Sequence, residues 1–305
     1  MPFKISLQPG GQQFSAETDQ SILEAALAAG FVVPYGCRDG ACGACKAHAL
    51  SDLSITVRSL SRAGDLPIKK LPCRVQSLEF PAPDVAVLKV KLPASEPFRF
   101  RAGQYIDFLL DGGRRRSFSI ANAPGDGEHL ELHIRRIDGG SFTGHVFTTM
   151  KLRDILRFEG PLGSFALGEG NAPVVLIAGG TGFAPIKSMV EDLIASGGQR
   201  SLTLYWGARS RAGLYMDEVA RSWEQTLPGF RYVPVLSDAG AADGWAGRTG
   251  LVHHAVMADL PDLSGHEVYA CGAPAMIDAA RADLIARCGL PSNAFFADAF
   301  TFAAT

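Results

Sequence analysis

Three of the six cysteines crowd into nine residues, at Cys37, Cys42 and Cys45. In a cytosolic protein such a cluster indicates a metal or redox site rather than disulfides. The C-x4-C-x2-C spacing is typical of a 2Fe-2S site, which a fourth thiolate further along the chain completes. Glycines between the cysteines let the loop wrap closely, so that backbone N–H groups can point at the cluster sulfur. The loop therefore predicts an iron–sulfur centre.

Two glycine turns in the C-terminal half have the form of nucleotide-binding loops. Gly180-Thr-Gly182 follows an apolar run at residues 174–178 and precedes a helical pattern. Such a turn brings the backbone close to a pyrophosphate at a helix N-terminus. This turn departs from the standard G-x-G-x-x-G motif, so alone it is weak evidence for a dinucleotide. A second turn, Cys271-Gly272, also ends a strand-like run and supports the same prediction. Together the two turns predict a dinucleotide site.

A third string, Arg116-Ser-Phe-Ser119, matches the Arg-x-Tyr/Phe-Ser/Thr signature of the ferredoxin–NADP reductase superfamily. Its physical chemistry suits a flavin. Arginine can bind a phosphate with two parallel hydrogen bonds, and Phe118 offers a π face to the isoalloxazine ring. A hydroxyl at Ser119 can hydrogen-bond near flavin N5 and tune electron and proton transfer. The predicted flavin residues of this string are Arg116, Ser117, Phe118 and Ser119.

The elements that must position these residues change character along the chain. Residues 3–7 alternate like a strand, and residues 21–30 carry an N-cap serine, a glutamate three positions later and a final glycine, which predicts a helix. From about residue 74 short strands separated by Gly, Pro and Asp turns predict a small antiparallel barrel. After about residue 170 apolar strands alternate with helices, which predicts a parallel sheet.

From end to end the chain resembles the NAD(P)H-dependent iron–sulfur flavoprotein reductases. These include the CDP-6-deoxy-Δ3,4-glucoseen reductases and the reductase components of bacterial aromatic-ring oxygenases. The resemblance implies a multidomain fold: a shortened β-grasp ferredoxin-like module at 1–68, an antiparallel β-barrel flavin domain at 69–169 and an α/β parallel-sheet nicotinamide-binding domain at 170–305. It also implies FAD, a 2Fe-2S cluster and NADH or NADPH as cofactors.

The resemblance also assigns residue roles. Ser119 and Cys271 would lie at the reacting rings, Cys271 as a soft contact rather than a nucleophile. The adenine side of FAD would contact His133, Ile134 and Arg135. The FAD pyrophosphate would bind at Gly140, Ser141, Phe142 and Thr143, which open a helical stretch. The nicotinamide nucleotide would bind at Gly180, Thr181, Gly182, Pro185, Cys271, Gly272 and Met276. We also expect Phe300 beside the flavin or docked on the hydrophobic core.

The fourth cluster ligand is an open question. In the family a final ferredoxin strand follows the fourth cysteine, whereas here the strand-like residues 52–57 precede Cys73. The tract that should carry the fourth ligand is missing from this chain. Either Cys73 substitutes as the fourth ligand, or it is a linker residue and the cluster is incomplete, labile or absent.

The site for the adenosine ribose gives two opposed signals. Ser237 and Asp238 follow a strand and would place a carboxylate beside the ribose hydroxyls, which repels a 2′-phosphate and favours NADH. Arg209, in a basic loop after another strand, could instead bind that phosphate. We expect NADH as the preferred donor, with NADPH possible.

Composition limits the partners. The 29 Lys plus Arg against 31 Asp plus Glu give a net charge of −2, so no nucleic-acid-binding field is evident. No apolar run is long enough to cross a membrane and no secretion signal is visible, so we expect a cytoplasmic monomer.

The predicted function is electron transfer from NAD(P)H through FAD and the cluster to an oxygenase or sugar dehydrase component. The alternatives are an NAD(P)H:flavin or dye reductase with an incomplete cluster, and a first module that serves only for docking.

Overall fold

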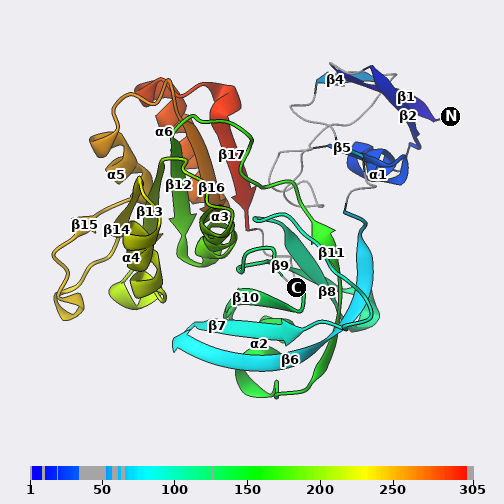
Figure 1. Ribbon diagram of the computed structural model, residues 1–305, viewed down its shortest axis with the longest axis horizontal. Helices are drawn as coiled ribbons and strands as arrows, with labels where there is room; N and C mark the ends of the chain where they lie inside the picture. The colour runs from blue at the N-terminus through cyan, green and yellow to red at the C-terminus, as the bar shows by residue number, and fades with distance from the viewer. Residues whose placement is uncertain are drawn as a thin grey trace.

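The computed structural model describes residues 2–8, 11–18, 20–33, 53–56, 61–62, 66–125 and 127–300. Its sheets follow one another along the chain, and in Figure 1 the N-terminal module, the antiparallel sheet and the parallel sheet occupy three separate parts of the view. In the described part of the chain, no helix is both long and apolar enough to span a bilayer. The three-part fold expected from the sequence is confirmed.

The N-terminal module is built on a small mixed sheet. Strand β1 (Phe3–Gln8) pairs antiparallel with β2 (Gln12–Ala16) and parallel with β4 (Leu53–Thr56). Helix α1 (Ile22–Ala28) begins at Ser21, whose side chain accepts from the Glu24 N–H while Glu24 accepts from the Ser21 N–H. This is the capping box that the sequence predicted. A short pair, β3 (Phe31–Val32) and β5 (Ser61–Arg62), follows. The loop with Cys37, Cys42 and Cys45 lies outside the described residues.

The second unit is a six-stranded antiparallel sheet with the order β10-β7-β6-β11-β8-β9. Its strands are β6 (Lys69–Ala82), β7 (Val85–Lys91), β8 (Tyr105–Leu109), β9 (Arg115–Ser119), β10 (His129–Arg135) and β11 (Ile155–Leu162). A bridge between Ile120 and Leu132 joins the two edges of the sheet, so it closes into the expected barrel. Helix α2 (Ser141–Thr148) packs Phe142 and Val146 into the barrel core.

The third unit is a parallel sheet with the order β15-β14-β13-β12-β16-β17. Its strands are β12 (Val174–Gly179), β13 (Leu202–Ala208), β14 (Phe230–Leu236), β15 (Arg248–Thr249), β16 (Glu267–Gly272) and β17 (Phe295–Ala299). Helices α3 (Phe183–Ala195) and α4 (Asp217–Thr226) pack into one hydrophobic core, and α5 (Val252–Asp259) and α6 (Pro274–Cys288) into another.

The strand order of the parallel sheet fixes where a ligand can bind. The chain runs outward from β12 to β15 and then returns to the other side of β12 with β16. In open parallel sheets a crevice forms outside the carboxyl ends of the strands where the order reverses. Both predicted glycine turns follow the two strands at this point, β12 and β16.

Candidate functional site

The two glycine turns interlock. A Cβ atom on Gly182 would lie 2.1 Å from the Cys271 carbonyl oxygen, and one on Gly179 would lie 2.6 Å from the Met276 sulfur. The backbone contact leaves no room for a side chain at Gly182, so this glycine allows the β12 and β16 turns to pack backbone to backbone, whereas a side chain at Gly179 would have to displace Met276. Thr181, Gly182 and Pro185 belong to the turn and the first part of α3. The structure thus brings the predicted nicotinamide residues together.

Cys271 lies at the centre of this packing and is fully buried. Burial, and then the nearby Asp298 carboxylate, raise the pKa of its thiol well above the ordinary value. A thiol that stays protonated is a poor nucleophile. Cys271 therefore suits a soft packing contact better than a nucleophilic role.

Sequence reasoning missed Asp298. Strand β17 pairs with β16 so that Asp298 lies directly beside Cys271, and only 6% of the residue is exposed. Burial raises the pKa of this carboxyl to about 6. Two residues after Asp298, Phe300 donates its N–H to the Gly272 carbonyl at 2.8 Å, and its ring packs against the core of the parallel-sheet domain. Phe300 is thus tied to the β16 turn.

The predicted flavin string forms β9. The guanidinium of Arg116 donates to the neighbouring Arg115 carbonyl. In the described part of the chain, no carboxylate forms an ion pair with it. Ser119 is buried, and the Phe118 ring lies 5.5 Å from that of Phe142 on α2. An arginine that no carboxylate neutralises, next to an aromatic ring, can receive a phosphate and a flat ring system.

The start of α2 is open to an anion. Gly140 is the N-cap and supplies no side-chain hydrogen bond to the first turn, which contains Ser141, Phe142 and Thr143. The first N–H groups of such a helix have no internal partner and attract negative charge. Gly139 has a φ of +74°, and a Cβ on Gly140 would lie 2.5 Å from the Thr143 hydroxyl. These features fit the pyrophosphate of a dinucleotide such as FAD.

The flavin string and the nicotinamide turns border the same contact between domains. Two residues after Ser119, the Ala121 carbonyl accepts from Lys187 Nζ at 3.4 Å, and the Asn122 carbonyl accepts from Ser188 Oγ at 2.7 Å. Both donors lie on α3, which begins at the Gly180–Gly182 turn. Arg135 on β10 covers that turn, because a Cβ on Gly180 would lie 3.1 Å from its guanidinium.

The residues predicted on β10 face in two directions. Ile134 lies in the barrel core, whereas His133 and Arg135 face the parallel-sheet domain. The His133 ring contacts Tyr215 and Phe183, which belong to that domain. The adenine-side contacts expected of His133, Ile134 and Arg135 remain predictions.

The predicted ribose residues come together at the ends of β13 and β14. The Ser237 N–H donates to the Ala208 carbonyl, and the Asp238 N–H donates to the Arg209 carbonyl, each at 2.9 Å. All three predicted side chains, those of Arg209, Ser237 and Asp238, are exposed. The Asp238 carboxylate and the Arg209 guanidinium thus lie at the same sheet edge, where the adenosine ribose is expected.

Among the cysteines in the described part of the chain, Cys73 is the one predicted as a possible fourth cluster ligand. Cys73 is not a linker residue: it lies within β6, 3% exposed, in the barrel core beside Leu71 and Val75. Burial raises the pKa of its thiol to about 12. Cys271 and Cys288 are likewise buried in the parallel-sheet domain. A core thiol is poorly placed to bind iron held by another module, so the described residues do not fit the fourth position.

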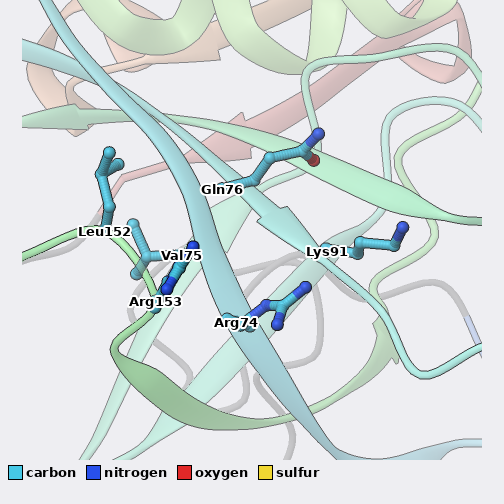
Figure 2. Close-up of a pocket in the computed structure, with 6 residues that line it drawn as sticks. All are labelled: Arg74, Val75, Gln76, Lys91, Leu152 and Arg153. Atoms are coloured by element: carbon cyan, nitrogen blue, oxygen red, sulfur yellow. The ribbon is translucent and has the colours of Figure 1, made fainter.

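A separate hollow lies on the outer side of the barrel (Figure 2). It has a volume of about 310 Å³ and is lined by Arg74, Val75, Gln76, Lys91, Leu152 and Arg153. Arg74 and Lys91 are register partners on β6 and β7, and their side chains point to the same side of β6. The hollow contains none of the predicted site residues.

Comparisons with known proteins agree with this geometry. Residues 5–76 match the 2Fe-2S iron-sulfur cluster binding domain, residues 72–167 the oxidoreductase FAD-binding domain and residues 176–282 the oxidoreductase NAD-binding domain. A CDP-6-deoxy-L-threo-D-glycero-4-hexulose-3-dehydrase reductase of Yersinia pseudotuberculosis is 41% identical, with 98% of this chain and 99% of that protein covered. The terephthalate 1,2-dioxygenase reductase component 1 of a Comamonas species is 37% identical, with 100% and 99% covered.

A solved structure agrees as well. The cytochrome P450 reductase GcoB of Amycolatopsis superposes with a TM-score of 0.81 at 31% identity, over 99% of this chain and 100% of that one. The alignment with the Yersinia reductase spans 330 positions against the 305 residues here, so that relative has at least 25 residues without a counterpart in this chain. The chain belongs to the ferredoxin reductase-type NAD(P)H oxidoreductases, which combine 2Fe-2S, FAD-binding and NAD-binding domains.

Proposed function

We propose that this reductase takes its electrons from NADH at the boundary between the barrel and the parallel-sheet domain and delivers them to a protein partner. The observation that carries the proposal is the contact of α3 with the segment after Ser119. Lys187 and Ser188 bond to Ala121 and Asn122 there, and the turn before α3 packs on Cys271. A flavin held by β9 and a nicotinamide held by the two turns would then meet at one boundary.

Each residue has a distinct part in this proposal. Arg116 and the open start of α2 bind the FAD phosphates, and Ser119 donates or accepts a hydrogen bond at the flavin edge. When bound, FAD accepts two electrons together from a nicotinamide and releases them singly. Cys271 supports the nicotinamide ring by packing. Asp298, beside it, can hold a proton up to about pH 6, because burial raises its pKa to about 6.

The choice between NADH and NADPH is proposed from Asp238. A carboxylate at the end of β14 disfavours a 2′-phosphate. Anaerobic titration of the FAD-loaded protein should therefore give a lower apparent Kd for NADH than for NADPH. Asp238→Ala should narrow the difference and Arg209→Ala should widen it. Tighter binding of NADPH by the unaltered protein would contradict the proposal.

The acceptor is proposed to be a component of an oxygenase or of a sugar dehydrase system. Relatives that match this chain over nearly their full length carry names of both kinds, a dehydrase reductase and a dioxygenase reductase component. Rates with purified candidate acceptors of each class, measured under one set of conditions, distinguish the two. A rate no higher with either protein than with free flavin would contradict a protein acceptor.

A second candidate function follows from the buried Cys73. If no thiolate completes the cluster, electrons leave from the flavin itself, to a free flavin, a dye or a partner. Iron, acid-labile sulfide and FAD measured on one purified sample decide this. Fewer than two iron atoms per FAD, both before and after cluster reconstitution, would support electron transfer to the acceptor directly from the flavin. Two irons and two sulfides per FAD would support the relay through a cluster.

A further inference from the structure

Three buried polar side chains and one partly buried tyrosine form a cluster across the boundary between the barrel and the parallel-sheet domain. We call Glu131, His133, Lys187 and Tyr215 the interdomain clamp. Glu131 and His133 lie on β10, Lys187 on α3 and Tyr215 just before α4. Glu131, His133 and Lys187 are each less than a tenth exposed. Buried polar groups need hydrogen-bond or charge partners, so a cluster of them holds its members in one arrangement.

The hydrogen bonds of the clamp have one consistent direction. His133 Nε2 lies 3.0 Å from Glu131 Oε1, and His133 Nδ1 lies 2.8 Å from the Tyr215 hydroxyl. The carboxylate can only accept, so Nε2 carries the proton and Nδ1 accepts from Tyr215. Burial lowers the pKa of His133, which keeps the ring neutral in this arrangement. Burial raises the pKa of Tyr215 well above its ordinary value, so its hydroxyl remains a donor.

The charges of the clamp are balanced across the boundary. Lys187 Nζ lies 3.1 Å from Glu131 Oε1 and 2.9 Å from Glu191, and Lys89 lies 3.4 Å from Glu131. Burial opposes ionisation of Glu131, but the hydrogen bond from His133 and the charge of Lys187 outweigh it and hold the pKa below its ordinary value. Removing one partner from a buried ion pair costs far more than removing an exposed one. The clamp therefore opposes separation of the two domains.

An aromatic stack connects the clamp to the nucleotide turn. The His133 ring lies parallel to Phe183 at 6.3 Å, and Phe183 stacks on Trp206 at 3.9 Å. Trp206 Nε1 donates to the Gly180 carbonyl at 3.0 Å. Phe183 directly follows Gly182, so the stack holds both ends of the turn against the barrel strand that carries His133.

We propose that the interdomain clamp positions the nicotinamide turn against the flavin, and so sets the rate of hydride transfer without touching either cofactor. The proposal rests on the function proposed above. Hydride transfer needs the two rings within van der Waals distance, and a displacement of about 1 Å can cost about 100-fold in rate. Tyr215 and Lys187 are thus positioning residues, and His133 joins them rather than serving as a direct flavin contact.

The test uses the full-length, FAD-loaded protein under anaerobic rapid mixing with NADH. Tyr215→Phe removes one hydroxyl and Lys187→Met removes the clamp cation. Each should lower the rate of flavin reduction at saturating NADH by about 10- to 100-fold. FAD content and the Kd for NADH should stay close to wild type. The long-wavelength absorbance that a nicotinamide stacked on a flavin produces should weaken. Lys187→Arg should recover much of the rate.

The matched control is Arg200→Met. Arg200 forms a 2.7 Å ion pair with Glu267 at the opposite, amino-terminal end of the parallel sheet, and its side chain is 7% exposed. This variant should lower the melting temperature about as much as Lys187→Met but leave the reduction rate unchanged. Because the clamp acts as a unit, the Tyr215→Phe/Lys187→Met double variant should be little slower than the slower single variant.

Two results would overturn the proposal. One is a wild-type reduction rate in both clamp variants. The other is a loss of rate in Arg200→Met equal to that in Lys187→Met, which would mean that stability alone sets the rate. If NADH fails to reduce the wild-type protein, the proposed function fails separately. Solution X-ray scattering then tests whether the interdomain clamp holds the two domains together. Tyr215→Phe and Lys187→Met should broaden the distribution of interdomain distances, and scattering equal to that of the wild type would overturn the proposal.

Discussion

The parallel-sheet domain and the N-terminal module build their cofactor sites in different ways. In the parallel-sheet domain the site consists of main-chain turns, where Gly182 packs on the Cys271 carbonyl and Gly179 on Met276. The cluster site expected in the N-terminal module would depend on four thiolates, and the cysteines that the structure describes are all buried in the cores of the other two domains. A site made of backbone depends on sheet topology as a whole. A site made of thiolates is incomplete once a single residue is lost.

The largest expected effect tests the backbone-built site. Gly182→Ala would place a Cβ 2.1 Å from the Cys271 carbonyl, so the two turns must separate. We expect NADH-dependent flavin reduction to slow by about 100-fold or more, with FAD still bound. Gly265→Ala is the control in the same domain, because its Cβ would meet no atom within 4 Å. Normal reduction by Gly182→Ala would show that close packing of the turns is unnecessary.

The next effect concerns Asp298, which depends on the same strand register. Its pKa is raised from 3.8 to about 6, so the folded protein binds the proton more tightly than the unfolded chain. The contribution of Asp298 to the free energy of unfolding is therefore fully present below about pH 4. It falls as the pH rises from about 4 through about 6, by up to about 3 kcal/mol in total. Asp298→Asn should remove this loss and be the more stable protein at pH 8, but not at pH 4.5. Urea unfolding across that range measures it, and parallel pH profiles would contradict the burial argument.

The smallest effect tests the thiolate site. Cys73→Ser leaves a hydroxyl in the barrel core and should cost about 1–3 kcal/mol of stability without changing the iron content. Cys288→Ser is the control, since Cys288 is also buried, in the core of the parallel-sheet domain. Iron that falls in Cys73→Ser and not in Cys288→Ser would identify Cys73 as a ligand. The comparison between the two regions would then no longer hold.

Local patterns in the sequence predicted much of this molecule. The Ser21–Glu24 capping box, the strands of the barrel and the glycine turn after β12 all depend on residues close in sequence. Asp298 was missed because its place beside Cys271 depends on the pairing of β17 with β16. The clamp was missed for the same reason: His133 and Tyr215 are 82 residues apart. Short-range periodicity carries no information on such pairs.

The central claim is that NADH passes its hydride directly to a flavin held at the barrel boundary. The most direct measurement is flavin reduction in rapid mixing with NADH that carries deuterium on the transferred C4 position. Direct hydride transfer predicts a primary isotope effect on the loss of flavin absorbance, and the loss of deuterium from the nicotinamide. A rate that is the same for both forms of NADH at every concentration, or a flavin that stays oxidised with NADH bound, would contradict it.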